Sequence, residues 1–165
     1  MVESHAVPGL SVPISELVPH AGAMSLLDRV LRVDDHSLEA EVTIRPGGLF
    51  GDECGGSAGV GAWVGVEYMA QAIAAWAGWH SRQRGEKPRI GFLLGTRRYD
   101  CERSVFLFGE SLHIRVQSQF QADNGLGQFA CQIMIDEIIV ASAALTVFEP
   151  QDSAALQAAT VTTPP

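Results

Sequence analysis

Residues 58–79 form an almost continuously apolar segment, long enough to be either a buried helix or a membrane span. Glu67 and Gln71 stand near the middle of this segment, which also contains four glycines. A carboxylate at the centre of a bilayer costs about 3 kcal/mol on insertion scales. A lone membrane helix would also leave the strand-like segments that follow unexplained. We therefore expect no membrane span, but a helix that protein surrounds on most sides.

Strand patterns lie on both sides of this helix, which we expect to start near Ser57 and to end at about Trp79 or His80. A hairpin is predicted before it, and a meander of three or four antiparallel strands after it. The clearest alternation predicts one face made of Leu112, Ile114, Val116, Ser118 and Phe120. The predicted strands cover residues 26–33, 38–44, 90–96, 105–108, 111–121, 129–135 and 138–148, and a short helix is predicted over 14–18.

A helix that is apolar on nearly all sides cannot lie on a flat sheet with its back in water. It needs a sheet that curls around it and a further element on its far side. This combination predicts an α+β protein with the hot dog fold, in which a curled antiparallel sheet wraps one long buried helix. We expect a flexible arm over residues 1–13, the folded domain over 14–150 and a disordered tail over 151–165. We also expect a dimer, because a second protomer would complete the burial of the helix.

The charge balance excludes a generic nucleic-acid binder. The 165 residues contain 11 Lys and Arg against 19 Asp and Glu, a net charge of −8. Local basic clusters, at residues 97–98 and over 82–89, are either a solvated surface or a docking face for an acidic carrier protein or a ligand phosphate. Cys54, Cys101 and Cys131 are widely spaced and no secretory signal precedes them, so we expect reduced thiols in a cytoplasmic protein. No metal-site spacing is present, and we expect no metal.

Glu67 and His20 are the candidates for chemistry. A carboxyl in the middle of an apolar helix is expensive to ionise, which suits a general acid or base, and Gln71 one turn later could hydrogen-bond to it. The alternative is a structural carboxylate that holds a polar network or a dimer contact. His20 lies among small residues that leave room around its imidazole, although a loop histidine can equally be an ordinary solvated one.

Several motifs carry a resemblance to a known family. Residues 19–30, Pro-His-Ala-Gly-Ala-Met-Ser-Leu-Leu-Asp-Arg-Val, resemble the start of hot dog 3-hydroxyacyl-acyl carrier protein dehydratases. Residues 66–71, Val-Glu-Tyr-Met-Ala-Gln, resemble the central helix of those enzymes, and residues 108–112 stand where they have Pro-Gly-Asp-x-Leu. The sequences of residues 67–72, 76–80 and 91–95 are most similar to those of the subgroup associated with aryl polyene synthesis. The resemblance covers residues 14–150.

This resemblance implies dehydration of a 3-hydroxyacyl thioester on acyl carrier protein to a trans-2-enoyl thioester, in fatty acid or polyene and polyketide synthesis. Glu67 would protonate the leaving hydroxyl, His20 would remove the α proton, and backbone N–H groups near the helix start would hold the thioester oxygen. Gln71 and the glycines near that start, Gly59 and Gly61, are the expected substrate-binding residues. No cofactor is expected beyond the phosphopantetheine of the acyl carrier protein.

One departure from the family pattern keeps two alternatives open. The better-known dehydratases carry a catalytic histidine before the helix, and residues 45–65 here contain none. Either His20 takes that role, or the chain is a non-catalytic partner of a related dehydratase in a heterodimer. A hot dog acyl thioesterase, with Glu67 as base or nucleophile, is the third possibility.

Overall fold

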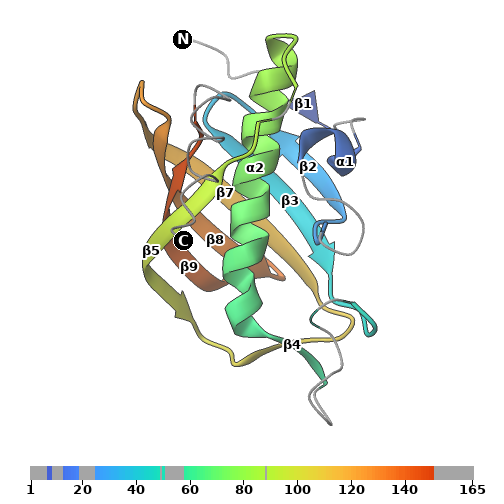
Figure 1. Cartoon of the computed structure of the whole chain (residues 1–165). Coiled ribbons are helices and arrows are strands. Elements are labelled where there is room, and N and C mark those ends of the chain that lie inside the picture. The colour runs from blue at the N-terminus through green and yellow to red at the C-terminus, as the bar shows by residue number, and fades with distance from the viewer. Residues whose placement is uncertain are drawn as a thin grey trace, which may run out of the picture.

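One antiparallel sheet and one long helix make up most of the fold (Figure 1). The structure is a computed structural model that describes residues 7–8, 13–18, 25–48, 50, 58–87 and 89–150. Within these residues the sheet has seven strands in the order β1-β2-β3-β7-β8-β9-β5, and β4 pairs with β6 separately. The elements are β1 (Val7–Pro8), α1 (Ile14–Leu17), β2 (Arg29–Val33), β3 (Ser37–Thr43), β4 (Gly59–Gly61), α2 (Gly65–Gln83), β5 (Phe92–Cys101), β6 (Val105–Leu107), β7 (Ser111–Gln121), β8 (Leu126–Ile135) and β9 (Ile138–Phe148).

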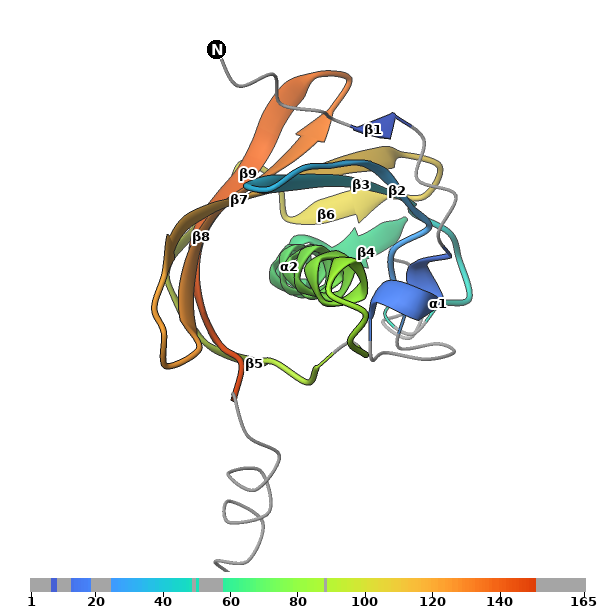
Figure 2. The same ribbon diagram turned by 90° about the horizontal axis from the view of Figure 1, so that it is seen from above.

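The sheet curls around α2, as the view from above shows (Figure 2). The strands β2 and β3 cover one side of the helix, β8 and β9 the next, and β5 the third, while α1 lies on the remaining side. The predicted hot dog architecture is therefore confirmed, with α1 as the element that covers the far side of the helix. Among the described residues, no helix combines the length and the apolar character that crossing a membrane requires.

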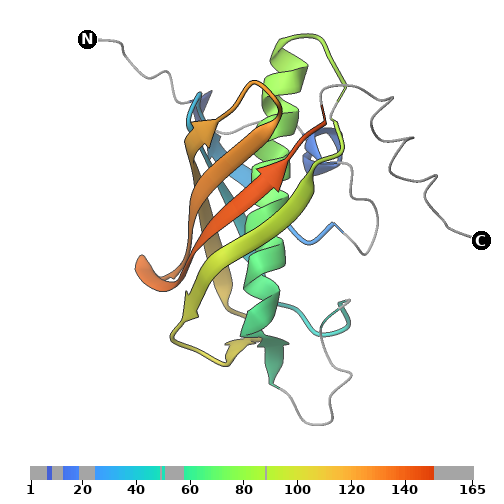
Figure 3. The same cartoon turned by 60° about the vertical axis from the view of Figure 1, so that its left-hand side comes forward.

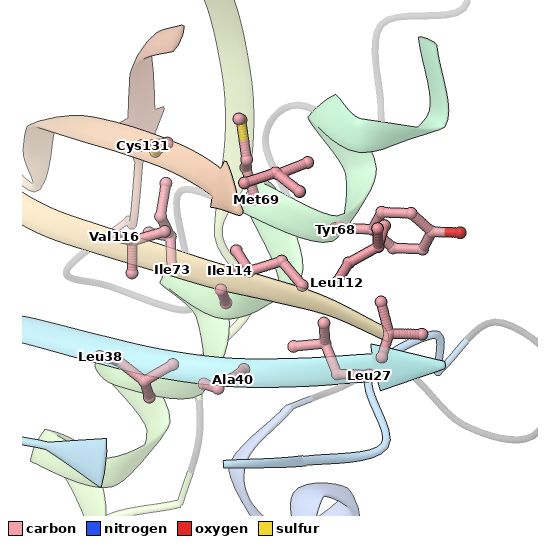
Figure 4. Packing of buried hydrophobic residues seen from close by; sticks show 14 of the residues in the cluster. Leu27, Leu38, Ala40, Tyr68, Met69, Ile73, Leu112, Ile114, Val116 and Cys131 are labelled. Atoms are coloured by element: carbon pink, nitrogen blue, oxygen red, sulfur yellow. The ribbon is translucent and has the colours of Figure 1, made fainter. Parts of the chain in front are cut away.

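The core forms where alternate residues of the strands meet α2 (Figure 4). Leu38 of β3 and Ile114 of β7 point inward and are fully buried, as are Met69 and Ala72 of the helix. Period-two burial along β3 and β8 confirms the predicted alternation. The prediction that Phe120 faces the same way as Leu112 and Ile114 is wrong, because Phe120 is 55% exposed. The pairing of β7 with β8 shifts register between Ser118 and Phe120, and this bulge turns the ring outward.

The short helix α1 packs closely on α2 at a glycine. A Cβ placed on Gly78 would overlap the backbone carbonyl of Leu17, so the two helices approach each other more closely than any side chain at residue 78 would allow. An ion pair between Arg82 and Glu16 spans the same contact at the surface. The long helix extends beyond its predicted end at Trp79 or His80, because α2 continues to Gln83.

The predicted start of the long helix is wrong. Residues Gly59–Gly61 form β4, which pairs with β6, and a 3-10 turn over Ala62–Val64 leads into α2 at Gly65. The backbone N–H of Ala62 donates to the carbonyl of Ser104, which fixes the turn to the segment before β6. A run of glycine, alanine and valine fits a strand as well as a helix, and here a partner distant in sequence selects the strand.

Parts of the predicted termini lie outside the described residues. Within the predicted arm the structure has β1, whose backbone pairs with β2, so that segment is not entirely a loose arm. The predicted tail over 151–165, the predicted cap Ser57 and the thiol of Cys54 lie outside the described residues.

Candidate active site on the central helix

Glu67 is held in the first turn of α2 by the neighbouring amide of Gln71. The Nε2 of Gln71 donates to Oε1 of Glu67 over 3.1 Å, which confirms the predicted hydrogen bond one helical turn apart. Gln71 is only 1% exposed, and its Oε1 accepts a bond of 2.8 Å from the backbone N–H of Leu26. The amide therefore orients the carboxyl and at the same time fastens the segment before β2 to the helix.

An apolar groove runs along the helix from Glu67. We call it the Glu67 groove; its volume is about 190 Å³. The strands β9 and β5, which cross α2 side by side in Figure 3, supply its opposite wall through residues 91–93 and 147–149. The helix supplies the wall made of Glu67, Ala70, Ile73, Ala74 and Ala77. A carboxyl held in place beside an apolar groove is an arrangement that can act as acid or base on an acyl chain.

A second cavity, of about 400 Å³, lies at the start of α2 and is lined by Tyr68 rather than Glu67. Burial, and secondarily the charge of Asp28, raises the pKa of Tyr68 to about 12, so its hydroxyl stays protonated at neutral pH. In Figure 4 this hydroxyl points away from the other labelled side chains. Asp28 pairs with Arg45 at 2.9 Å on the same wall. Leu26 lines this cavity too, so its bond to Gln71 connects the cavity wall to the Glu67 carboxyl.

The glycines predicted to bind substrate have a packing role in β4. A Cβ on Gly59 would overlap the carbonyl oxygen of Phe106 in the paired strand, and a Cβ on Gly61 would overlap the Trp63 indole. Neither lines the Glu67 groove or the cavity beside Tyr68. Their binding role stays a prediction, as do the catalytic roles of Glu67 and His20.

Some of the backbone N–H groups expected to hold a thioester oxygen already donate hydrogen bonds within the protein. The Ala62 N–H donates to Ser104, and that of Gly65 donates within the 3-10 turn. The hydroxyl of Tyr99 on β5 donates to the Ala62 carbonyl over 2.5 Å and so ties this turn to the sheet. These bonds fix the turn to the sheet and so set the position of Glu67, which follows the turn by three residues.

Comparisons with known proteins decide the family. The model of the ApeP-like family, described as ApeP dehydratase, matches residues 12–158. The chain belongs to the ApeP-like dehydratase family. None of the curated proteins matches it.

Solved structures agree with this ApeP-like assignment. The dehydratase heterocomplex ApeI:P from Xenorhabdus doucetiae is similar at 29% identity and a TM-score of 0.80, over 90% of this chain and 97% of that one. A hypothetical thioesterase with coenzyme A from Streptococcus pneumoniae TIGR4 matches at 12% identity and 0.56, over 76% of this chain and 88% of that one. The Escherichia coli PaaI protein of a phenylacetic acid degradation operon matches at 13% and 0.54, over 73% and 78%. The last two share the fold alone.

The histidine expected to work with Glu67 in this ApeP-like chain, His20, lies outside the described residues. The described histidines have other surroundings. His113 bonds Glu39 at 3.1 Å on the outer face of the sheet. His80 stands thirteen residues beyond Glu67, about 20 Å along α2, packed against Trp76. Burial lowers the pKa of His80. The role of His20 as the base stays a prediction.

Most of the basic residues that flank the site are ion-paired at the surface. Arg84 and Arg89 both bond Glu86, at 3.4 and 3.0 Å, and Arg98 bonds Asp100 at 2.6 Å. This pairing favours the solvated-surface interpretation for Arg84 and Arg98, whereas Arg89 also lines the Glu67 groove. Among the described residues no group of His, Cys, Asp and Glu is arranged to hold a metal ion.

The sequence interpretation missed the far end of the groove. The sequence leaves Arg89 as either a solvated surface residue or part of a docking face, and it assigns no role to Glu149, yet both line the groove. The spacing of Glu67, Ala70, Ala74 and Ala77 was a usable signal, because small residues at three- and four-residue steps leave one helix face hollow.

Proposed function

We propose that this chain dehydrates a 3-hydroxyacyl thioester, carried on the phosphopantetheine of acyl carrier protein, to the trans-2-enoyl thioester. The observation that carries the proposal is the Glu67 carboxyl, oriented by Gln71 and lining an apolar groove, in a chain of a dehydratase family. The alcohol and the thioester α carbon must both lie near Glu67, while the groove takes the rest of the acyl chain.

The proposed reaction needs two proton transfers. The His20 imidazole removes the α proton, and Glu67, in its acid form, protonates the departing hydroxyl, so the C–O bond breaks, water leaves and the double bond forms. The Gln71 amide, which donates to Oε1, orients the carboxyl for this transfer. Support for His20 comes from the Leu26 bond, which fastens the segment that follows His20 to the amide that orients Glu67.

The direct test incubates the purified protein with a 3-hydroxyacyl thioester of acyl carrier protein and follows the product by mass spectrometry. The proposal expects loss of one water with the thioester intact. A free acid would instead identify a thioesterase. Controls are the untreated thioester and protein heated above its melting temperature.

We also propose that the chain pairs with a related hot dog dehydratase along β5. The similar ApeI:P structure is a heterocomplex, and β5 is the last strand of the sheet in the described part of the chain. Large apolar side chains at the start of this strand and just before it are all more than 40% exposed: Ile90, Phe92, Leu93 and Leu94. An exposed apolar sheet edge can pair with a strand of another chain. Leu94→Glu should dissociate the complex in light scattering, whereas Ile138→Glu, at an exposed isoleucine elsewhere, should not.

A second candidate function is a non-catalytic subunit of that complex. It is favoured by the absence of histidine from residues 45–65 and by the heterocomplex formed by the similar structure. The pure chain would then show no dehydration, and Glu67→Gln within the complex would leave turnover unchanged. Activity that depends on Glu67 in either preparation contradicts this candidate.

A further inference from the structure

The Glu67 groove ends at charged residues, not at an apolar wall. It follows α2 from Glu67 to Ala77, about 15 Å at the helical rise of 1.5 Å per residue. A neighbouring cavity near the helix C-terminus is lined by Ala77, Arg89 and Glu149, and the same three residues line the groove. Arg89 and Glu149 therefore stand at the end of the groove that is opposite Glu67.

The wall between these ends suits a hydrocarbon chain. On the helix side Ala70, Ala74 and Ala77 present methyl groups beside the Ile73 side chain, so this wall is apolar between its ends. Phe92 and Phe148 lie among its strand residues. An apolar ligand gains free energy by leaving water for such a wall, whereas a polar group placed midway would lose its hydrogen bonds.

The far end offers hydrogen bonds in both directions. Oε1 of Glu149 lies 4.0 Å from Nη1 of Arg89, and Glu86 bonds Nη2 of the same arginine at 3.0 Å. The Glu149 side chain is 28% exposed, and burial, partly offset by Arg89 and Arg84, raises its pKa. A half-buried carboxyl and a guanidinium can accept from and donate to a hydroxyl, but a methyl group placed there would cover them without replacing water.

We propose that the acyl chain of the substrate lies along the Glu67 groove, and that Glu149 and Arg89 recognise a hydrogen-bonding group, such as a hydroxyl, at its distal end. The inference rests on the proposed function, because that function places the thioester end at Glu67. It makes Glu149 a specificity-determining residue that selects polar-tipped over methyl-tipped chains.

The first experiment compares two substrates with the same number of carbons, 3-hydroxytetradecanoyl thioester with a terminal methyl and with a terminal hydroxyl, because a chain of this length extends about as far beyond C3 as the groove runs from Glu67 to Ala77. The wild type should prefer the hydroxyl-tipped chain in kcat/KM, and Glu149→Ala should reduce that preference roughly tenfold, the effect of one hydrogen bond. Glu102→Ala, an exposed glutamate outside the groove, is the control and should keep the preference. A wild type without the preference, or an unchanged preference in Glu149→Ala, would overturn the proposal.

The second experiment narrows the groove. Ala74→Leu should lower the ratio of kcat/KM for tetradecanoyl over butyryl substrates by at least about tenfold, because only the long chain reaches the added side chain. Ala130→Leu makes the same change at an exposed position on β8 and should keep the ratio. Equal losses of kcat/KM for the long and the short substrate would show that the acyl chain does not lie along the Glu67 groove.

Binding measurements distinguish a failure of the proposed function from a failure of the groove assignment. Acyl pantetheine amides, which cannot react at the carbonyl as thioesters do, report on the groove alone in calorimetry. If no substrate is dehydrated but the hydroxyl-tipped amide binds better than the methyl-tipped one, and Glu149→Ala removes the difference, the groove assignment stands without the reaction. Equal binding of both amides to the wild type overturns it.

Discussion

Gln71 supports two contacts, and replacing it tests whether they position the acid. Gln71→Leu keeps the approximate volume of a buried side chain but removes the acceptor of the Leu26 N–H and the donor to Glu67. The helix turn would remain, while the carboxyl and the segment before β2 would each lose a fixed partner.

The size of the effect follows from what is left behind. A buried donor without an acceptor costs about 1–3 kcal/mol, and the hydrogen bond to the Glu67 carboxyl contributes about 0.5–1.5 kcal/mol. Leucine offsets part of this loss by adding apolar burial, so we expect the free energy of unfolding to fall by about 1–3 kcal/mol. For a chain of this size each kcal/mol shifts the melting temperature by about 2–4 °C, which predicts a decrease of about 2–12 °C.

Urea unfolding followed by tryptophan fluorescence measures this loss, and a parallel turnover assay reports the position of Glu67. Gln117→Leu is the matched control, because it makes the same change at an exposed strand position. Should Gln71→Leu unfold at the same urea concentration as Gln117→Leu, with equal turnover, the bridging role of Gln71 would be refuted.

Two further changes test the packing around the site. Gly78→Ala, which in an open helix would stabilise by about 0.5–1 kcal/mol, should instead lower the melting temperature, since its Cβ overlaps the Leu17 carbonyl; a melting temperature at or above that of the wild type would contradict this. Burial alone would raise the pKa of Glu110, but hydrogen bonds from Arg103 and the Leu107 N–H outweigh it and lower that pKa below the ordinary 4.5. A lowered pKa adds stability above pH 4.5 that is lost as the pH falls through the folded value, so Glu110→Gln should destabilise at neutral pH and match the wild type in strong acid, as circular dichroism melts can measure.

Local patterns predicted the elements whose partners are near in sequence. Alternation over residues 38–44 and 111–121 gave β3 and β7 with nearly correct bounds, and β9 spans the predicted 138–148. A helix that is apolar on nearly all sides must be surrounded by protein, and this requirement alone predicted the sheet that curls around it. The bond between Gln71 and Glu67 followed from helical spacing.

Features that depend on distant partners were not predictable in this way. The strand β4 forms because β6 pairs with it, and the alternation around Phe120 fails because of a bulge against β8. Glu149 joins the groove only because the curl of the sheet brings the end of β9 beside α2. No helix or strand periodicity in the sequence relates Glu67 to Glu149, so their common groove could not be predicted.

The central claim is that the Glu67 carboxyl donates a proton to the leaving hydroxyl, and its most direct test is the turnover of Glu67→Gln. The amide keeps the shape and the hydrogen-bonding capacity of the side chain but cannot supply a carboxylic proton. With a 3-hydroxyacyl thioester, formation of the enoyl product should fall about 10²–10⁴-fold, while the melting temperature stays close to that of the wild type. Glu102→Gln, the matched change at an exposed glutamate, should retain full turnover. Unchanged turnover in Glu67→Gln would contradict the claim and leave Glu67 a structural residue.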